Sequence, residues 1–335
     1  MQFQRILIVQ TAFIGDVILA TPIVSQLRKY YPDARIDFLL RKGNESLFQE
    51  DHRIDEVIVW DKKAGKYKQL FSLLKKVRGT GYDLLVNLQR FASMGFLTCF
   101  SKAGLKVGFD KNPFSFSYDL QVRHTVDKGK HEVRRNLDLI SAFVDEEEVL
   151  PSLEIPASSK EKIASYQKGD YLTIAPTSVW FTKQYPIEQW IKFIESSSFE
   201  GKIYLLGAPP DSKSCDEIVA KTPHHEVANL CGKLSLLDSA ALMKGAVMNF
   251  VNDSAPMHLA SAMNAPVTAV YCSTVPEFGF GPLSEKSHVI ENHNDLDCRP
   301  CGLHGFKTCP KGHFKCAYDI PTSLLVETIP DLKSP

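Results

Sequence analysis

The sequence predicts an α/β protein made of two doubly wound, Rossmann-like domains that face each other across a cleft. Three observations predict this class. Short β-branched runs alternate with amphipathic segments almost from the first residue, which is typical of parallel sheets covered by helices. The length of 335 residues suits two domains of ordinary size. A stretch of acidic residues, prolines and serines at residues 145–159 interrupts the alternation, which then resumes.

Each expected element follows from its own composition. Residues 5–10 are typical of a buried strand, and an amphipathic helix is expected from about residue 17 to residue 31, because Pro32 cannot continue it. The other elements of the first domain are predicted as strands at 35–40, 56–60 and 82–87 and a basic helix at 69–78. Those of the second domain are predicted as strands at 171–175, 202–206, 246–251 and 267–271 and a helix beginning near Pro186. The domains are therefore placed at residues 1–155 and 156–335.

Composition excludes several classes of protein. An apolar content of 44% with 23% charged residues excludes a disordered tail protein, a collagen-like fibre and a small disulfide scaffold. The net charge of zero argues against a dedicated nucleic-acid-binding protein. No apolar run approaches the roughly 18 residues needed to span a bilayer, and the first ten residues do not resemble a signal peptide. A cytoplasmic protein is expected.

The neutral total hides an asymmetry between the two halves. Residues 1–144 contain 23 Lys and Arg against 15 Asp and Glu, whereas residues 145–335 contain 16 against 24. The excess in the first half is concentrated at Lys62, Lys63, Lys66, Lys68, Lys75, Lys76 and Arg78. A basic half suits contact with an anionic glycolipid or membrane surface. A solvated helix face is the alternative interpretation for any single lysine.

The first loop carries a candidate general base. Asp16 follows the predicted strand 5–10, at the carboxyl end where doubly wound domains bind their ligands. A carboxylate at that position is able to remove a proton from a bound ligand. A helix cap is the alternative, because Asp also caps helices well.

The equivalent loop of the second domain, residues 176–186, carries a candidate phosphate site. It contains hydroxyl groups at Thr177, Ser178 and Thr182 and a single cation at Lys183. Lysine binds phosphate groups as a point charge. A solvated surface lysine is the alternative for Lys183 taken alone.

Residues 252–258 follow a buried strand and open a helix of small residues. Free backbone N–H groups and the positive end of the helix dipole make such a start able to bind an anion. Asp253 is able to accept a hydrogen bond from a ligand hydroxyl, and His258 lies one turn into the helix. Capping explains Asp253 or Ser254 alone, but not their pairing with His258.

The tail is rich in cysteine and histidine. Cys298 and Cys301 have the C-x2-C spacing of zinc ligands, and Cys309 and Cys316 follow at intervals that match no standard zinc finger. A structural zinc ion held by these four cysteines is one interpretation, and reduced packing thiols are the other. No cofactor is expected to be required for activity.

Taken together, these segments are similar in order and spacing to one known family. From about residue 4 to residue 320 the chain resembles the ADP-heptose:lipopolysaccharide heptosyltransferases. The matching stretches are residues 14–16, 131–137, 176–186, 206–207, 231–235 and 252–258. The cysteine pattern of the tail resembles that of the heptosyltransferase II branch. The family usually has Gly in place of Ala255 and Pro-Gly in place of Pro176-Thr177, which bears on the identity of the donor.

The resemblance implies a GT-B fold with an N-terminal acceptor domain and a C-terminal nucleotide-sugar domain. It implies inverting transfer of a heptose from ADP-heptose to the inner core of lipopolysaccharide, at the inner face of the cytoplasmic membrane, with Asp16 as the base. The candidate donor-binding residues are Thr177, Ser178, Thr182, Lys183, Gly207, Asp253, Ser254, Ala255 and His258. The candidate acceptor-binding residues are Arg41, Arg90, His131 and Arg135.

Three alternative functions stay open at this point. A related GT-B enzyme could use another nucleotide-sugar, and a non-catalytic protein could bind a nucleotide or a glycan. An NAD-dependent oxidoreductase is disfavoured, because the first loop offers only Gly15 and lacks the three spaced glycines of the dinucleotide fingerprint.

Overall fold

The chain divides into two compact units. The computed structural model describes residues 2–126, 129–145, 147–223 and 225–331. Unit 1 comprises Met1–Glu154 and unit 2 comprises Ile155–Pro335, a division one residue from the expected boundary. Glu146 of the acidic stretch lies outside the described residues. Across the described residues, no helix is both long and apolar enough to cross a bilayer.

Unit 1 is built on a parallel sheet of six strands in the order β3-β2-β1-β4-β5-β6. All the strands are parallel, and successive strands are added on one side of β1 up to β3 and on its other side from β4 onward. Doubly wound sheets bind ligands at this switch point between β1 and β4. The strands are β1 (Arg5–Val9), β2 (Arg35–Arg41), β3 (Glu56–Trp60), β4 (Leu84–Asn87), β5 (Leu105–Phe109) and β6 (Leu120–Val122). Ile6 pairs with Leu84 and Val9 with Asn87, so the ends of β1 and β4 lie side by side.

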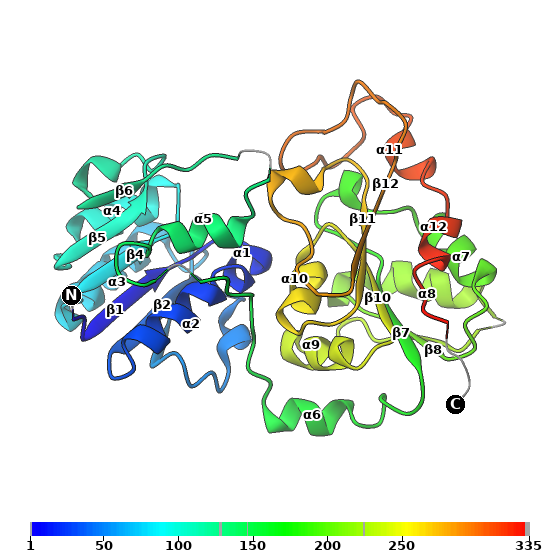
Figure 1. Ribbon diagram of the computed structural model, residues 1–335, viewed down its shortest axis with the longest axis horizontal. Coiled ribbons are helices and arrows are strands. Elements are labelled where there is room, and N and C mark those ends of the chain that lie inside the picture. Colours follow the sequence, from blue (N-terminus) through cyan, green and yellow to red (C-terminus); the bar gives the residue numbers. More distant parts are fainter. Residues whose placement is uncertain (1, 127–128, 146, 224, 332–335) are drawn as a thin grey trace. The chain divides into compact units, whose positions relative to one another are not determined.

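Helices cover both faces of this sheet (Figure 1), which explains why its central strands are apolar throughout rather than alternating. The helices of unit 1 are α1 (Ile14–Ile18), α2 (Thr21–Tyr30), α3 (Lys66–Thr80), α4 (Ala92–Phe100) and α5 (Glu132–Asp138), and short 3₁₀ turns lie at Glu45–Phe48 and Ser115–Ser117. The single helix expected over residues 17–31 is wrong. It is broken between Ile18 and Thr21, because Pro22 has no N–H to donate to the carbonyl of Ile18, which accepts a 2.7 Å hydrogen bond from the Thr21 hydroxyl instead.

Unit 2 repeats the topology of unit 1. Its sheet has the order β12-β11-β10-β7-β8-β9, which is the same strand order when counted from β7. The strands are β7 (Tyr171–Ala175), β8 (Lys202–Leu205), β9 (Val227–Asn229), β10 (Met248–Asn252), β11 (Val267–Tyr271) and β12 (Ser287–Glu291). The switch point therefore lies between β7 and β10, which pair directly.

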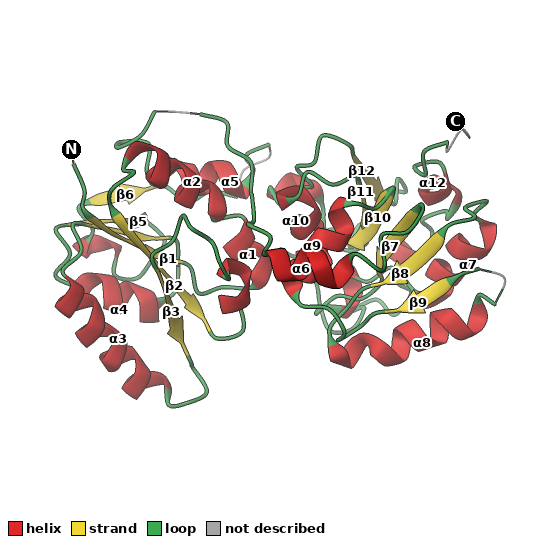
Figure 2. Cartoon of the chain, turned by 90° about the horizontal axis from the view of Figure 1, so that it is seen from below, coloured by secondary structure: helices red, strands yellow, loops and turns green. Residues whose placement is uncertain are grey.

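The helices of unit 2 again lie on both faces of the sheet (Figure 2). They are α6 (Ala157–Ile163), α7 (Ile187–Ser196), α8 (Ser212–Lys221), α9 (Leu236–Lys244), α10 (Ala255–Ala262), α11 (Lys315–Tyr318) and α12 (Ser323–Val326), with 3₁₀ turns at Phe181–Lys183, Pro209–Asp211 and Pro276–Phe278. As expected, α7 begins directly after Pro186, whose fixed φ suits a helix start.

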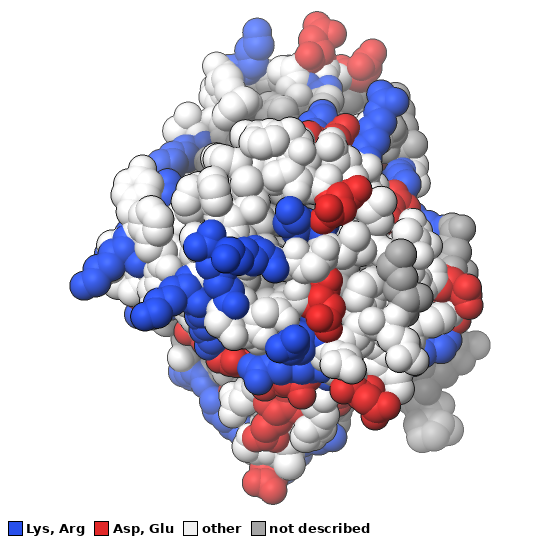
Figure 3. All heavy atoms as spheres, turned by 90° about the vertical axis from the view of Figure 1, so that its left-hand side faces the viewer, with Lys and Arg blue, Asp and Glu red and all other residues white. Residues whose placement is uncertain are grey.

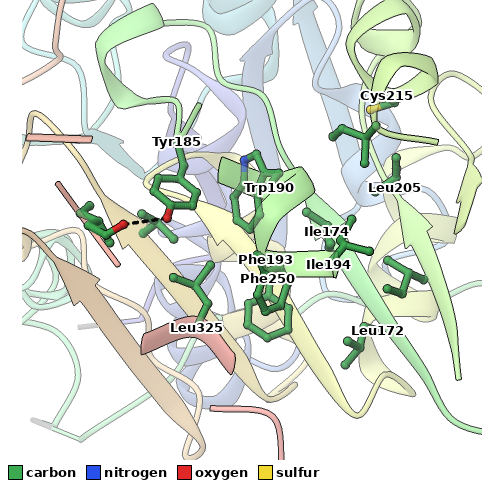
Figure 4. Close-up of a cluster of buried hydrophobic side chains, with 14 of the residues drawn as sticks. Leu172, Ile174, Tyr185, Trp190, Phe193, Ile194, Leu205, Cys215, Phe250 and Leu325 are labelled. Atoms are coloured by element: carbon green, nitrogen blue, oxygen red, sulfur yellow. Dashed lines mark hydrogen bonds between the residues drawn. The ribbon is translucent and has the colours of Figure 1, made fainter. Parts of the chain in front are cut away.

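A core of aromatic and branched side chains lies between α7 and the sheet of unit 2 (Figure 4). The Phe193 and Phe250 rings lie 4.5 Å apart, and the Trp190 ring packs edge-on against Tyr185 at 5.2 Å. The Tyr185 hydroxyl donates a 2.9 Å hydrogen bond to the carbonyl of Ile320. The buried tyrosine thereby attaches the tail to the core, two residues after the candidate phosphate-binding lysine.

Candidate functional site

Asp16 lies where the sequence places it, in the first turn of α1 just after β1. Its Oδ2 accepts a 3.1 Å hydrogen bond from the N–H of Phe13, the residue before the helix. Asp16 thus satisfies one of the free N–H groups at the helix start. The capping interpretation is confirmed in part, but one bonded oxygen does not prevent the carboxylate from meeting a ligand.

A second carboxylate sets the electrostatics of Asp16. Burial, followed by the negative charge of Glu132, raises the pKa of Asp16 to about 6, while the Phe13 N–H and Arg90 oppose the shift. Two carboxylates that share a poorly solvated site disfavour each other's ionised form. Asp16 is therefore still mostly ionised at neutral pH, yet it is a stronger base than an ordinary aspartate.

Glu132 is held by Arg135, and its helix is fixed to the end of α1. Its Oε2 accepts a 2.6 Å bond from Nε of Arg135, one turn further along α5, and both side chains are buried. The amide of Asn136 donates a 3.1 Å bond to the carbonyl of Leu19 at the end of α1. Helices α1 and α5 are thus fixed against each other, and they bring together residues that are more than one hundred positions apart in the sequence.

The four candidate acceptor residues do not share one environment. The guanidinium of Arg41 lies over the Phe13 ring at 4.5 Å, and Arg90 lies close enough to Asp16 to influence its pKa. His131 caps α5, with Nδ1 accepting a 3.2 Å bond from the N–H of Val133. Arg135 is only 2% exposed and paired with Glu132. Arg41 and Arg90 therefore remain suited to ligand contact, whereas His131 and Arg135 stabilise α5 and hold Glu132.

Sequence reasoning missed two titratable residues in this region, Glu132 and His124. The His124 ring is buried and packs edge-on against Phe109 at 4.8 Å. Burial, followed by Arg90, lowers the pKa of His124, and neither ring nitrogen has a hydrogen-bond partner among the described residues. A lone histidine carries no motif. Glu132 did lie within a matched stretch, but nothing in its position indicates that it faces Asp16.

In unit 2 the two predicted loops meet in an ion pair. The Nζ of Lys183 lies 2.7 Å from Oδ2 of Asp253, and both side chains are largely buried. The same oxygen accepts a 2.6 Å bond from the Thr274 hydroxyl. The pair joins the loop after β7 to the loop after β10 at the switch point of the sheet. Lys183 is therefore a fixed cation and not a solvated surface lysine.

Thr182 has a different role from the one expected. It is only 1% exposed, and its hydroxyl oxygen accepts bonds of 3.0 Å from the Ser273 hydroxyl and 2.7 Å from the N–H of Phe306. A Cβ on Gly305 would lie 2.8 Å from this oxygen, and the φ of Gly305 is +74°, so only glycine fits there. Thr182 joins the tail to the site, and its hydroxyl is occupied by protein groups.

Asn252 positions the other hydroxyl-bearing residues. Its Oδ1 accepts a 2.8 Å bond from the N–H of Tyr185, and its amide donates to the carbonyls of Ala175 and Thr177 at 3.3 and 3.5 Å. The carbonyl of Ser178 accepts a 2.6 Å bond from Gln184. The backbones of Thr177 and Ser178 are thus held in place while their side chains stay half-buried. Asn252 has this role only because β10 ends beside β7.

Helix α10 begins beside the ion pair. Ser254 is its extended N-cap residue and Ala255 its first residue, with Pro256 next. His258 is buried within the helix. These positions agree with an anion site at the helix start. Gly207 lies elsewhere: a Cβ there would come within 2.8 Å of the Cys231 sulfur, so this glycine is required for packing, and its role in donor binding stays a prediction.

The cysteines of the tail gather around one cavity. Cys298, Cys301, Cys309 and Cys316 line a space of about 240 Å³ together with His313. Burial, followed by Cys301 and Cys309, raises the pKa of Cys316 to about 12. Within the ranges that the structure describes, no three His, Cys, Asp or Glu side chains converge to hold a metal ion. The zinc interpretation stays a prediction.

The two regions complement each other chemically. Unit 1 presents a carboxylate whose raised pKa suits proton removal. Unit 2 presents a fixed ammonium group beside a helix start, which suits a diphosphate. An enzyme that joins a nucleotide-activated group to a hydroxyl needs both.

The fold is shared with solved glycosyltransferases. The crystal structure of the family 9 glycosyl transferase from Veillonella parvula superposes with a TM-score of 0.84 at 21% sequence identity, covering 98% of this chain and 96% of that one. The structure of Escherichia coli ADP-heptose LPS heptosyltransferase II superposes with a TM-score of 0.79 at 19% identity, covering 97% of each chain. The two doubly wound units therefore form a GT-B fold, as the sequence predicted.

The sequence comparison defines the family. The model for glycosyltransferase family 9 (heptosyltransferase) matches residues 70–305, more than half of the chain. The lipopolysaccharide heptosyltransferase 3 of Escherichia coli K12 is 28% identical over 276 residues, which are 78% of this chain and 80% of that protein. The chain belongs to glycosyltransferase family 9. It is an enzyme of the glycosyltransferase class, which decides against the oxidoreductase and the non-catalytic alternatives.

Proposed function

We propose that this enzyme transfers a heptose from ADP-heptose to the inner core of lipopolysaccharide, with inversion at the anomeric carbon. Family membership supports heptosyl transfer, and the names of similar proteins contain ADP-heptose and lipopolysaccharide. The observation that carries the proposal is Asp16, a carboxylate at the carboxyl end of β1 with a pKa of about 6. That pKa leaves it ionised at neutral pH and able to accept a proton.

In the proposed reaction, unit 2 binds the donor. Cleavage of the bond between the anomeric carbon and the diphosphate leaves negative charge on the departing ADP. The ammonium group of Lys183 and the N–H of Ala255, the first residue of α10, are fixed before the reaction begins, so they stabilise this charge without reorganising. Asp253 holds Lys183 through the 2.7 Å ion pair, and Thr274 in turn holds Asp253.

Unit 1 binds the acceptor in the same proposal. Asp16 takes the proton of the acceptor hydroxyl as its oxygen attacks the anomeric carbon from the face opposite the diphosphate, which inverts the configuration. Arg90 provides positive charge near Asp16, and Arg41 lies over the Phe13 ring; two such cations suit an acceptor that carries phosphate groups. Because such an acceptor is a glycolipid, the reaction is placed at the cytoplasmic face of the inner membrane.

The direct test is a transfer assay read by mass spectrometry. The protein is incubated with ADP-heptose and a lipopolysaccharide core truncated before its heptoses, and with one that already carries heptose. A mass gain of one heptose on either acceptor supports the proposal and identifies the acceptor. Parallel reactions with UDP- and GDP-sugars test the alternative donor. Transfer from one of those, and none from ADP-heptose, would overturn the donor assignment and leave the family assignment intact.

A further inference from the structure

Five phenylalanines form a continuous cluster on the outside of unit 1. They come from three separate segments: Phe71 from α3, Phe96 and Phe100 from α4, and Phe114 and Phe116 from the turn before β6. The Phe96 ring is central, with ring centres 5.9 Å from Phe71, 4.7 Å from Phe100 and 6.1 Å from Phe114. Phe116 extends the chain of contacts at 6.1 Å from Phe114. We call these five residues the aromatic patch.

Three of the five rings of the aromatic patch are exposed to solvent, and the other two, Phe96 and Phe114, are half-buried. The exposed fractions are 59% for Phe71, 43% for Phe100 and 75% for Phe116. Tyr67, one turn before Phe71 on α3, is 70% exposed. Exposed apolar residues that are scattered singly need no explanation, but a contiguous group of large rings is typical of an interaction surface. Helices α3 and α4, which carry most of it, pack side by side on the outer face of the unit (Figure 2).

The segment that carries the aromatic patch is basic. Residues 62–116, which include all five phenylalanines, contain eleven Lys and Arg and two acidic residues, Asp83 and Asp110. Asp83 is already occupied, because Oδ2 accepts bonds of 2.9 Å from the N–H groups of Gln4 and Arg5. Lys75 lies one turn after Phe71 on the exposed side of α3, and Nε of Arg78 donates a 2.6 Å bond to the carbonyl of Phe100. The basic and aromatic side chains therefore occupy one surface.

The space-filling view shows this end of unit 1. Lys and Arg side chains gather on one part of the face next to a broad area of uncharged side chains, and acidic side chains lie beside basic ones in the middle and at the bottom of the view (Figure 3). Of the basic residues on α3, Lys76 forms an ion pair with Glu56, so its charge is balanced within the protein. Lys68 and Lys75 are exposed and form no ion pair with any residue that the structure describes, so their charges are available to a partner.

We propose that the aromatic patch and its basic rim dock unit 1 on the surface of an anionic lipid bilayer. Phenyl rings enter the boundary between headgroups and acyl chains, and long lysine side chains reach the headgroups beside them. Each Lys or Arg near an anionic membrane surface strengthens the attraction to it. A second copy of the chain is a poorer occupant, because it would bring the same positive rim and the like charges would repel. The aromatic patch belongs to α3, α4 and the turn before β6, whereas Asp16 lies on α1.

Vesicle co-sedimentation tests the proposal directly. The full chain is mixed with vesicles of phosphatidylcholine alone and with vesicles of equal parts phosphatidylcholine and phosphatidylglycerol, at low and high salt. We expect binding to the mixed vesicles, at least tenfold weaker binding to phosphatidylcholine, and a loss of binding as salt rises. Equal binding to both vesicle types at every salt concentration would overturn the role of charge.

Two double variants separate the aromatic from the basic contribution. Phe71→Ser/Phe116→Ser and Lys68→Glu/Lys75→Glu should each reduce the bound fraction at least tenfold, because each removes one of the two interactions. Lys168→Glu/Lys213→Glu makes the same charge change on exposed residues of unit 2 and should change binding less than twofold. All the substituted side chains are exposed, so the melting temperatures should match that of the parent.

The outcomes also decide between occupants of the surface. If the aromatic variant binds vesicles as well as the parent does, the proposal is wrong. If that variant instead converts an oligomer to a monomer in light scattering, the patch is a contact between copies of the chain. Neither result depends on glycosyl transfer, so failure of the membrane proposal leaves the proposed reaction untouched.

Discussion

The two units share one topology but carry opposite electrostatics at the same place. In each sheet the order of the strands switches beside the first strand. In unit 2 the candidate residues follow β7 and its neighbour β10, whereas in unit 1 Asp16 follows β1 and Glu132 lies on α5, after β6. In unit 1 burial and the negative charge of Glu132 raise the pKa of Asp16. In unit 2 a carboxylate and an ammonium group, Asp253 and Lys183, neutralise each other. Topology therefore fixes where a site lies, and the charges of the side chains decide which chemistry it can perform.

The largest expected effect follows from removing the unit 1 base. Asp16→Asn keeps an oxygen that accepts the Phe13 N–H, so the helix start should persist while the basic group is lost. Transfer should fall about 10³-fold, within the range for loss of a general base, and calorimetry should show unchanged ADP affinity. Asp33→Asn, an exposed aspartate of the same unit, is the control. Full activity of Asp16→Asn would show that Asp16 is not the base and that unit 1 does not supply it.

The next largest effect is expected in unit 2. Lys183→Ala removes the cation and leaves Asp253 with an unbalanced charge beside the donor, so ADP binding should weaken about tenfold and turnover should fall about 100-fold. Calorimetry and steady-state kinetics measure the two losses. Lys192→Ala, an exposed lysine on α7, should change neither. An unaltered ADP affinity of Lys183→Ala would remove the lysine from the donor site.

A smaller effect is expected from the second carboxylate of unit 1. Because Asp16 must be ionised to act as a base, kcat/KM should rise with pH and level off above about 6. Glu132→Gln removes a negative charge that raises the pKa of Asp16, so this rise should move to lower pH by up to about one unit. Glu50→Gln, on the surface of the same unit, should leave the profile in place. A rise at the parent's pH in Glu132→Gln would contradict the coupling of the two carboxylates.

The smallest effect is expected from metal removal. The proposed donor site meets the diphosphate charge with Lys183 and the start of α10, so EDTA should leave the rate of transfer unchanged. Elemental analysis of the same samples shows whether the tail cysteines hold zinc, and a melting curve shows whether its removal affects stability. A rate that falls with EDTA and returns with added Mg²⁺ or Zn²⁺ would contradict the proposed metal-free donor site.

Much of the fold was predictable because it depends on local patterns. The alternation of buried strands and amphipathic helices predicted four of the six strands of each sheet but not β5, β6, β9 or β12, and Pro186 marked the start of α7 correctly. The break between α1 and α2 was also encoded locally, by Pro22, but the apolar periodicity on both sides of it concealed the break. The candidate residues at strand ends followed from the general rule for ligand sites in doubly wound sheets.

The parts of the site that escaped prediction depend on distant segments. The hydroxyl of Thr182 was expected to bind phosphate, yet its oxygen accepts a hydrogen bond from the N–H of Phe306, which lies 124 positions away in the sequence. Asp16 was expected as a base, but its raised pKa depends on burial and then on Glu132 in another helix. The aromatic patch joins three segments, none of which has an unusual composition by itself. Such contacts form only when packing places the elements side by side.

The sequence by itself determined the class of fold, the division into two units, and the loops at whose ends Asp16, Lys183 and Asp253 lie. These follow from local periodicity and from the order of strands and helices, which each segment carries within itself. The tertiary structure alone decided which of those residues are paired, buried or shifted in pKa, and which surface stays uncovered. Those properties depend on distances between residues far apart in the chain, and only the packing of the folded structure fixes these distances.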